Sequence, residues 1–376
     1  MTDRNGGKHF HMRNDKWHKI QSEDVLSCIL SRLPVKSVLV SKTVSKHWNK
    51  LICSQEFVDM HLRWSRQNPM YIVSLDPIGR NLLLMKGDGE VIEMIILPGL
   101  KSPFPLYVIC SHDGLICCIN LPPTGDLSDV GFRIFNVATR DMFLLPRGKT
   151  SKARPVYGVA FGPKINEYKV FRFFHSRSYN PKNYHQCEVY SSGSGCWRDI
   201  GRVLHRPARS CNNFSGSNHV YVNGEVFWFT ALENDLTVPG SILAVDWEEN
   251  FRTISLPVEV TEHSYLIELE CCLSLVAMDN EDETVDIWIL RHFSESSWEK
   301  RSSAIVPFSN YECLCSVAAQ NSEKFFITSE HYFFYNIDSK TWRELDLAEN
   351  FRWNTSVVFT YTESLLRCCG RLVPEA

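Results

Sequence analysis

The sequence predicts a mixed fold, in which a small all-α unit of three short helices precedes a large all-β, propeller-like domain. Between residues 18 and 62, apolar side chains recur at helical spacing. From residue 63 onward, strand-like segments alternate with polar turns, and one pattern recurs at intervals of 44 to 54 residues. We therefore divide the chain into a flexible polar leader (1–17), a helical unit (18–62) and a β domain (63–376).

Composition and charge indicate a soluble globular protein whose partners are other proteins. Lys and Arg total 40 against 43 Asp and Glu, so the net charge of −3 provides no basic surface for nucleic acid or for an anionic membrane. No apolar stretch approaches the length of about 20 residues that spans a bilayer. The polar N-terminus lacks the apolar region of a signal peptide. We expect an intracellular location, in the cytoplasm or the nucleus, where the 14 cysteines stay reduced.

The first helix is predicted to begin at Ser22, whose hydroxyl can cap a helix that opens with Glu23 and Asp24. Its apolar face continues to Leu33. Pro34 ends this helix and can occupy the first turn of the second one.

A third helix is predicted by apolar residues at positions i, i+4, i+7 and i+8, namely Val44, Trp48, Leu51 and Ile52. Ser54 can cap a short fourth turn. A unit of roughly 45 residues buries too little surface to be stable alone, so we expect it to need a neighbour, with Trp48 as an anchor. The alternative is a helical cap that only packs on the β domain.

Residues 22–62 resemble the F-box in its plant form. The order Glu-Asp-Val-Leu, Ile-Leu, Arg-Leu-Pro-Val-Lys-Ser, Val-Ser-Lys-x-Trp and Leu-Ile occurs there without a gap. The resemblance implies a fold of three short helices that docks on a Skp-type adaptor, which in turn links to a cullin ubiquitin ligase. Carried over position by position, it implies that the docking residues are Ile20, Val25, Ile29, Leu30, Leu33, Pro34, Val44, Trp48, Leu51 and Ile52.

Departures from the family pattern predict weaker adaptor binding than usual, although we still expect binding. Ile20-Gln21 stands where the family usually has Leu-Pro, so an apolar anchor remains but the stiff proline entry is lost. Ser41 and Thr43 stand where the family tends to have an aromatic residue and a cysteine. Each hydroxyl costs about 1–3 kcal/mol if it has no hydrogen-bond partner.

The β domain is predicted from one recurring pattern: an alternating apolar strand, a polar turn, an aromatic residue and a second short strand. It occurs in FRIFNVATRDMFLLP, CEVYSSGSGCWRDIG, SILAVDWEENFRTISLP, VDIWILRHFSESSWEK and HYFFYNIDSKTWRELDL, with a poorer copy ending at EVIEMIILP. The aromatic residues that follow the turns are Phe143, Trp197, Phe251, Trp298 and Trp342. Such a period, with about four strands in each repeat, predicts a propeller of six or seven blades, with a β-sandwich as the competing architecture.

Two further signals favour the propeller. The stretches HDGLICCINL and VNGEVFWFTA each place a glycine after a polar residue, as a tight hairpin needs. The final NTSVVFTYTESLL is strand-like and can pair near the start of the domain, which would close the ring.

Several stretches between residues 107 and 300, among them HDGLICCINL, FNVATRDMFLLP and VNGEVFWF, resemble the F-box-associated domain of plant F-box proteins and occur in the same order. That domain is related in form to kelch-type propellers. Their glycine, aspartate and aromatic residues serve turns and packing, so they identify no target. We interpret Arg140 and Asp141 in the same way, as solvated turn residues.

No catalytic, metal or cofactor site is predicted. The chain lacks a Gly-x-x-x-x-Gly-Lys phosphate loop, a Gly-x-Ser-x-Gly elbow and any Cys-x-x-Cys pair. We interpret the cysteines as buried thiols rather than nucleophiles. The side chains of adjacent cysteines point to opposite faces if they lie on strands, and the adjacent pairs are Cys117-Cys118, Cys271-Cys272 and Cys368-Cys369.

The sequence thus favours a non-catalytic substrate receptor of an SCF-type (Skp–cullin–F-box) ubiquitin ligase. The helical unit would bind the adaptor, and the propeller would bind an unidentified target protein, with neither nucleic acid nor membrane as a partner. Two alternatives stay open: a propeller enzyme or sugar-binding propeller with an incidental helical cap, and an F-box scaffold that causes no degradation. The longest candidate target-binding loops are LPPTGDLSDVG, HSRSYNPKNYHQ, GRVLHRPARSCNNFSGS and ENDLTVPG.

Overall fold

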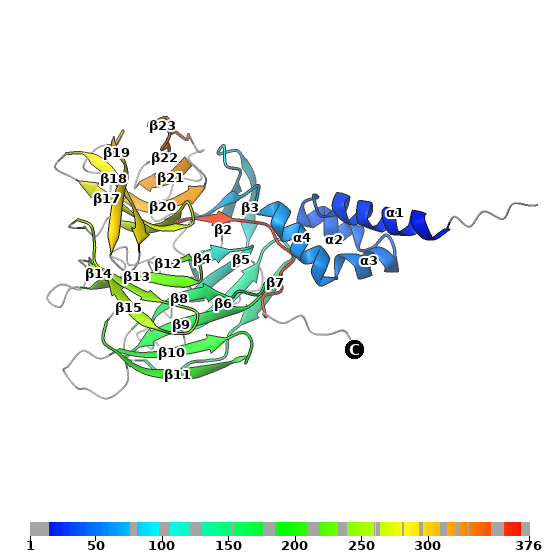
Figure 1. Ribbon diagram of the computed structural model, residues 1–376, viewed down its shortest axis with the longest axis horizontal. Helices are drawn as coiled ribbons and strands as arrows, with labels where there is room; N and C mark the ends of the chain where they lie inside the picture. Colours follow the sequence, from blue (N-terminus) through cyan, green and yellow to red (C-terminus); the bar gives the residue numbers. More distant parts are fainter. Residues whose placement is uncertain are drawn as a thin grey trace, which may run out of the picture.

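The structure consists of a helical unit attached to one end of a ring of sheets (Figure 1). It is a computed structural model. The residues that it describes are 15–75, 81–97, 106–120, 130–151, 154–175, 185–205, 207–208, 219–231, 239–258, 260, 264–279, 282–292, 296–308, 314–320, 323–328, 331–346 and 357–369. Residues 1–14 of the predicted leader lie outside them.

Four helices form the helical unit: α1 (Asp15–Leu30), α2 (Val35–Ser41), α3 (Lys46–Ile52) and α4 (Gln55–Ser65). Helix α1 begins before Ser22, so the prediction that Ser22 caps it was wrong. Pro34 is the N-cap of α2 rather than a residue of its first turn, because its extended backbone precedes the helix. Val44 lies in the turn before α3, whose N-cap is Ser45.

The predicted fourth turn is a full helix of 11 residues. Ser54 caps it as predicted, since its side chain accepts a hydrogen bond from the Phe57 N–H. One face of α4 is buried, comprising Phe57, Val58, His61 and Leu62. This helix therefore connects the two units by packing as well as by sequence.

Six four-stranded antiparallel sheets make the propeller. From the inner to the outer strand, blade 1 is β24 (Val357–Tyr361), β1 (Met70–Ser74), β2 (Asn81–Met85) and β3 (Val91–Ile96). Blade 2 is β4 (Leu106–His112), β5 (Leu115–Asn120), β6 (Gly131–Asn136) and β7 (Asp141–Leu144). Blade 3 is β8 (Val156–Phe161), β9 (Tyr168–Phe174), β10 (His185–Ser191) and β11 (Cys196–Val203).

The remaining blades repeat this order. Blade 4 is β12 (His219–Val222), β13 (Glu225–Ala231), β14 (Pro239–Val245) and β15 (Phe251–Ile254). Blade 5 is β16 (Tyr265–Leu269), β17 (Cys272–Asp279), β18 (Thr284–His292) and β19 (Ser297–Ile305). Blade 6 is β20 (Leu314–Gln320), β21 (Glu323–Thr328), β22 (Tyr332–Asn336) and β23 (Thr341–Glu344). The predicted repeats are the third and fourth strands of blades 2 to 6.

The ring closes between the two ends of the domain, as the sequence predicted. The C-terminal strand β24 pairs antiparallel with β1, with Thr360 opposite Tyr71. Blade 1 therefore takes its inner strand from the C-terminal end of the domain and its three outer strands from the N-terminal end. Each of the six inner strands that the structure describes is paired with the second strand of its blade.

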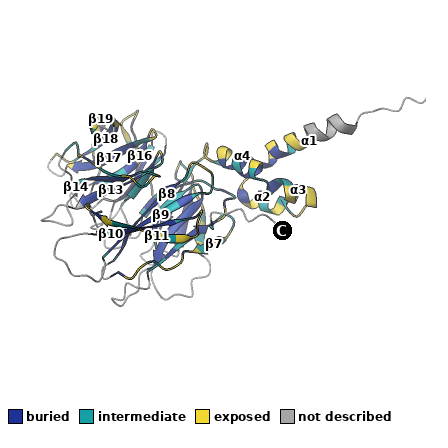
Figure 2. Ribbon diagram, turned by 60° about the horizontal axis from the view of Figure 1, so that its bottom comes forward, coloured by how far each residue is buried: buried dark blue, intermediate teal, exposed yellow. Residues whose placement is uncertain are grey.

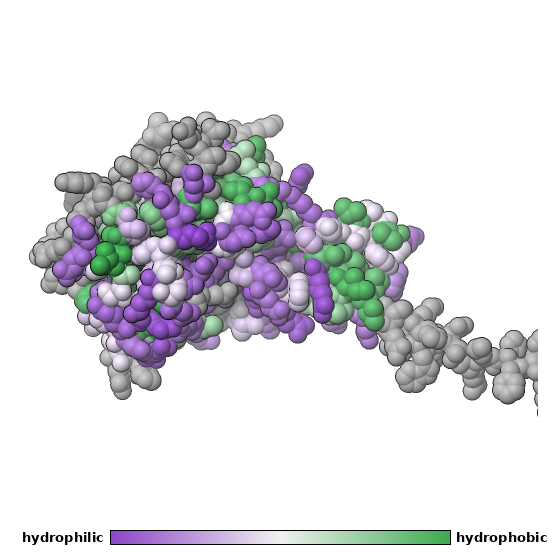
Figure 3. Space-filling model, turned by 90° about the horizontal axis from the view of Figure 1, so that it is seen from above, coloured by the Kyte–Doolittle hydropathy of each residue, from purple (hydrophilic) through white to green (hydrophobic). Residues whose placement is uncertain are grey.

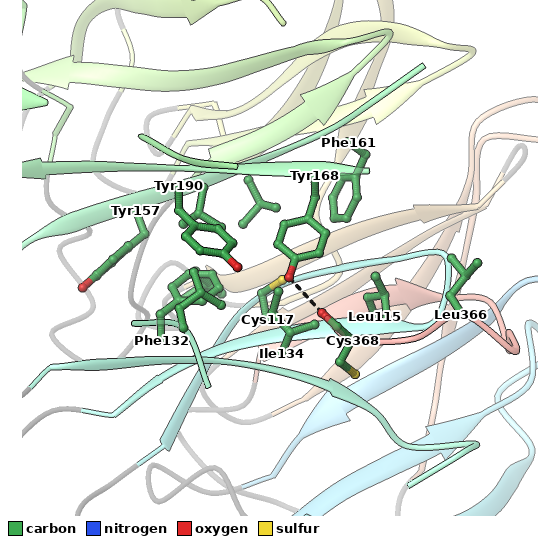
Figure 4. Packing of buried hydrophobic residues seen from close by; sticks show 14 of the residues in the cluster. Leu115, Cys117, Phe132, Ile134, Tyr157, Phe161, Tyr168, Tyr190, Leu366 and Cys368 are labelled. Carbon is green, nitrogen blue, oxygen red and sulfur yellow. Dashed lines mark hydrogen bonds between the residues drawn. The ribbon is translucent and has the colours of Figure 1, made fainter. Parts of the chain in front are cut away.

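The core of the domain lies between neighbouring blades, where apolar clusters fill the spaces. Figure 2 shows that buried residues follow the strands of the propeller. Figure 4 shows the cluster between blades 2 and 3. Cys117 belongs to this cluster and Cys118 to the one between blades 1 and 2, so their side chains point to opposite faces as predicted. The five predicted aromatic residues of the outer strands are partly buried and pack against these clusters.

The prediction that the cysteines are buried was wrong for several of them. Cys117, Cys118, Cys187 and Cys368 are buried, but Cys28, Cys196 and Cys271 are exposed. Cys271 forms part of the tight turn between β16 and β17 and has a positive φ of 57°, which places it outside the core. The burial of Cys118 raises the pKa of its thiol, which makes it a poor nucleophile.

The two ends of the propeller differ. Because each blade is an antiparallel meander, the turns between its first and second strands lie at one end and the loops between its second and third strands at the other. The turn Asp113-Gly114 has φ values of 48° and 81°, and the turn Asn223-Gly224 has values of 49° and 90°, as tight hairpins require. We call the end with these turns the helix-side end, because the helical unit contacts it through Asp113, and the other the far end.

Candidate functional site

The free face of the helical unit carries apolar side chains. Val25 and Ile29, one turn apart on α1, each keep 56% of their surface exposed, and Val44 keeps 61%. The Nε2 atom of His47 on α3 lies 3.9 Å from the Oε1 atom of Glu23 on α1, which brings the start of α3 beside α1. Figure 3 shows apolar side chains gathered on the helical unit. Exposed apolar surface of this kind is a candidate interaction site.

Nine of the ten residues that the F-box resemblance implies for docking fall into three groups. Four are exposed: Val25, Ile29, Pro34 and Val44. Three are half-buried and pack against the helical core: Leu33, Trp48 and Leu51. Leu30 and Ile52 are buried within that core, beside Val38 and Phe57. Ile20 lies on α1, but its side chain is outside the described part of the chain.

The two hydroxyls that depart from the family pattern both have partners. Ser41 Oγ donates a hydrogen bond to the Ser37 carbonyl at 2.9 Å, and Thr43 Oγ1 donates to the Val40 carbonyl at 2.7 Å. The penalty for an unpaired hydroxyl therefore does not apply, because each side chain donates to a backbone carbonyl of α2.

The opposite face of the helical unit is fixed to the propeller. Val58 and Leu62 of α4 belong to the apolar cluster between blades 2 and 3. Arg66, which follows α4, donates two hydrogen bonds to the Asp113 carboxylate at 2.9 and 2.6 Å. Burial alone would raise the pKa of Asp113, but His112 and Arg66 outweigh it and hold that pKa below its ordinary value. The carboxylate thus stays charged at the junction.

A C-terminal strap, residues 362–369, also joins the two units. The Val35 N–H at the start of α2 donates to Glu363 Oε2 at 3.1 Å, and Leu365 packs against the helical core. Tyr168 donates its hydroxyl hydrogen to the Cys368 carbonyl at 2.8 Å (Figure 4). The strap passes close to the backbone of Gly114. A Cβ atom at this position would lie 2.7 Å from the Thr362 carbonyl oxygen, so only glycine fits there.

The strap also corrects one prediction. Asp141 is not a solvated turn residue, because its carboxylate accepts a hydrogen bond from the Cys368 N–H at 2.8 Å. Asn136 is fully buried and donates to the carbonyls of Ser364 and Leu366 at 3.0 and 2.9 Å. No sequence signal distinguished these residues from ordinary turn residues, because their partners are more than 200 positions away.

The candidate target-binding loops leave the propeller from the far end. They follow β5, β9, β11 and β13, whose last residues all lie at the end opposite the Asp113 turn. Most of their residues, 121–129, 176–184, 209–218 and 232–238, lie outside the described residues.

Within the described ranges, no three His, Cys, Asp or Glu residues are grouped so that they could hold a metal ion. None of the helices described is long and apolar enough to cross a membrane.

Comparisons with known proteins agree with this architecture. The F-box domain matches residues 22–59, and the F-box associated beta propeller domain matches residues 97–363. F-box protein At5g49610 of Arabidopsis thaliana is 26% identical over 86% of this chain and 90% of its own length. F-box/kelch-repeat protein At2g43445 of the same plant is 26% identical over 74% of this chain and 64% of its own length.

Among solved structures, a DUF4784 family protein from Bacteroides caccae is 9% identical and aligns with a TM-score of 0.43 over 78% of this chain and 74% of its own. That likeness is too low to carry an argument. The domain match, which spans well over half of the chain, decides the assignment. This chain belongs to the family of F-box proteins with an F-box associated β-propeller domain.

Proposed function

We propose that this protein is the substrate receptor of an SCF-type ubiquitin ligase. The F-box would dock on a Skp-type adaptor, and through it on a cullin, while the propeller would hold a target protein. One observation carries the proposal: the F-box leaves Val25, Ile29 and Val44 exposed on its free face, while its other face is buried on the propeller. An exposed apolar face on an otherwise well-packed unit is the expected form of a docking surface.

In this role the docking residues would have two different functions. Val25, Ile29, Pro34 and Val44 would contact the adaptor directly, together with the exposed parts of Leu33, Trp48 and Leu51 and with Ile20. The buried side chains of Leu30 and Ile52 would instead hold the helices at the angle that presents this face.

The chain itself would make or break no covalent bond. Its contribution would be proximity, because tethering raises the effective concentration of the target at the site of ubiquitin transfer. The rigid junction formed by α4, Arg66 and the strap supports this role, since it fixes the far end of the propeller relative to the adaptor. We infer that the target binds at the far end, and that the protein acts in the cytoplasm or the nucleus.

The first test is co-purification of a Skp-type adaptor with the intact chain and with the Ile29→Glu and Val44→Glu variants. Both side chains are exposed, so a charge there should leave the fold intact and abolish adaptor binding. Ile305→Glu is the matched control, because Ile305 is 72% exposed on blade 5, away from the F-box. Failure of the intact chain to bind, or undiminished binding by both F-box variants, would contradict the proposal.

A second measurement separates a degradative receptor from a non-degradative scaffold. Proteins that co-purify with the intact chain should have longer cellular half-lives when Ile29→Glu replaces it. Unchanged half-lives for all of them would favour the scaffold. The enzyme and sugar-binding alternatives have no specific observation in their favour.

A further inference from the structure

The outer edge of each blade is a strand with a neighbour on one side only. Among the described strands, β3 pairs with β2 alone, so the backbone N–H and C=O groups along its other side have no partner strand. The outer strands of the other five blades are in the same position. An edge of this kind can pair with a strand of another chain, and natural proteins usually prevent such pairing with charged residues or with short edge strands.

The edges of blades 2 to 6 have this protection. Strands β11, β19 and β23 carry charged residues at exposed positions, for example Arg198 and Asp199, Glu299 and Lys300, and Glu344. Strands β7 and β15 are short, with four residues each. The exposed residues of β7, Met142 and Leu144, are apolar, but so short a strand offers few backbone groups. None of these five edges is therefore a good template for a further strand.

Strand β3 of blade 1 has neither form of protection. It contains six residues, and its exposed positions are all apolar: Val91 at 36%, Ile92 at 44%, Met94 at 53% and Ile96 at 66% of their surface. Its only charged residue, Glu93, already forms an ion pair with Lys36 of α2 in the same chain. An apolar strand with high strand propensity and no free charge is the kind of edge that extends a sheet between molecules.

The exposed side chains of β3 continue the apolar face of the strand beside it. Met94 lies opposite Leu83 of β2, and Leu83 packs in the cluster between blades 6 and 1. Met94 therefore faces blade 6, and Ile96 shares that face because it is two residues farther along. Ile95 points to the other face and packs against the cluster between blades 1 and 2. A strand added to β3 would extend both apolar rows and cover Met94 and Ile96 from the open side.

From these observations we propose that two copies of the chain associate by antiparallel pairing of β3 with β3, which joins two blades into one continuous sheet. A second copy is the occupant that β3 itself fits. In such a two-fold pair, one residue of the strand lies opposite its own copy. At Glu93 this would oppose two glutamates, which is unfavourable. At Met94 it pairs the two methionines and places each Glu93 opposite Ile95 of the second copy, so no like charges meet.

The test is the mass of the full-length chain in sedimentation equilibrium, measured from about 1 to 100 μM because a contact of one strand pair is small. The mass should rise with concentration from 43.4 kDa toward twice that value. Met94→Lys and Ile96→Lys should each remain at 43.4 kDa, because a lysine on an edge strand opposes pairing. Both side chains are exposed, so circular dichroism and thermal unfolding should show an unchanged fold.

Two controls show where the copies meet. Ile305→Lys makes the same change at an exposed apolar residue on the outer strand β19 and should leave the association unchanged. Ile29→Glu, on the exposed apolar face of the F-box, should also leave it unchanged. Loss of association in Ile29→Glu would mean that the copies meet through the F-box, and this would overturn the proposal.

The Met94→Cys variant tests the register. Oxidation with diamide should link two copies through a disulfide, and mass spectrometry of the digested dimer should find the peptide that contains position 94 joined to itself. The proposal is overturned if this self-linked peptide does not form, or if Met94→Lys and Ile96→Lys associate like the intact chain. It is also overturned if the intact chain stays at 43.4 kDa at every concentration, and β3 would then be left to a strand of a different protein.

Discussion

Asn136 anchors the C-terminal strap, and its substitution tests how strongly the strap is held. Its side-chain amide donates to the Ser364 and Leu366 carbonyls, and its Oδ1 accepts the Ala138 and Thr139 N–H groups of its own turn. Asn136→Ala therefore removes two turn bonds and leaves two buried strap carbonyls without a donor. Each unsatisfied buried group costs about 1–3 kcal/mol, so the two strap carbonyls together should contribute about 2–6 kcal/mol.

Blade 6 contains the matched control. Asn336 occupies the same position in its hairpin as Asn136, opposite Thr341 where Asn136 faces Asp141. Its Oδ1 accepts the Asp338 and Ser339 N–H groups, so the same turn bonds are present. It makes no contact with the strap among the described residues. Asn336→Ala therefore measures the turn bonds alone, and the difference between the two variants isolates the strap.

The assay combines urea unfolding with amide hydrogen exchange. Asn136→Ala should lose about 2–6 kcal/mol more unfolding free energy than Asn336→Ala, and the amides of residues 362–369 should lose protection only in Asn136→Ala. Equal losses in the two variants, or strap amides that stay protected in Asn136→Ala, would refute the view that Asn136 holds the strap.

Three further outcomes follow from single contacts. Ser45→Ala should cost about 1 kcal/mol in urea unfolding, because the Ser45 hydroxyl caps α3 by accepting the Trp48 N–H; a cost near zero would show that the cap contributes nothing. Glu188→Gln should cost about 3–5 kcal/mol, because it leaves the buried Arg172 guanidinium without its partner carboxylate, and Arg172→Met in the same chain should recover part of that loss. Burial lowers the pKa of His219 from 6.5 to about 4, so the unfolded chain takes up a proton that the folded chain does not. His219 should therefore lower the stability by up to about 3 kcal/mol as the pH drops from about 6.5 toward 4. His219→Gln should reduce the slope in urea unfolding by that amount without abolishing it, because burial also lowers the pKa values of His61 and His112.

The repeating part of the fold could be predicted from the sequence because each repeat encodes its own local structure. The aromatic residue that follows each turn packs between two blades. Trp197 and Trp298 also donate a hydrogen bond from the indole N–H to a carbonyl at the end of the preceding blade. The sequence left the count at six or seven blades, because the blade that contains β24 and β1 is assembled from the two ends of the domain. Neither half of that blade shows the complete repeat.

In the helical unit, the spacing of apolar residues predicts the helices but not the direction that each side chain faces. Helical spacing identified Val25, Ile29, Leu30 and Ile52 as apolar positions, but it does not tell which of them face a partner and which face the core. The structure separates them, because Leu30 and Ile52 pack with Val38 and Phe57 in the helical core, while Val25 and Ile29 stay exposed. The sequence also placed the start of the first helix too late, since Ser22 has the chemistry of a cap but helix α1 continues through it.

The sequence did not predict the strap, but the topology of the ring explains its position. Because β24 runs antiparallel to β1, the chain leaves β24 at the same end of the propeller at which α4 delivers it to β1. The residues after Tyr361 therefore emerge beside the helical unit, where Glu363 meets the start of α2 and Leu365 meets the helical core. Closing the ring and fixing the F-box are thus two consequences of one strand pairing. A chain that failed to pair β24 would lose both the closed propeller and the fixed angle at which the F-box is held.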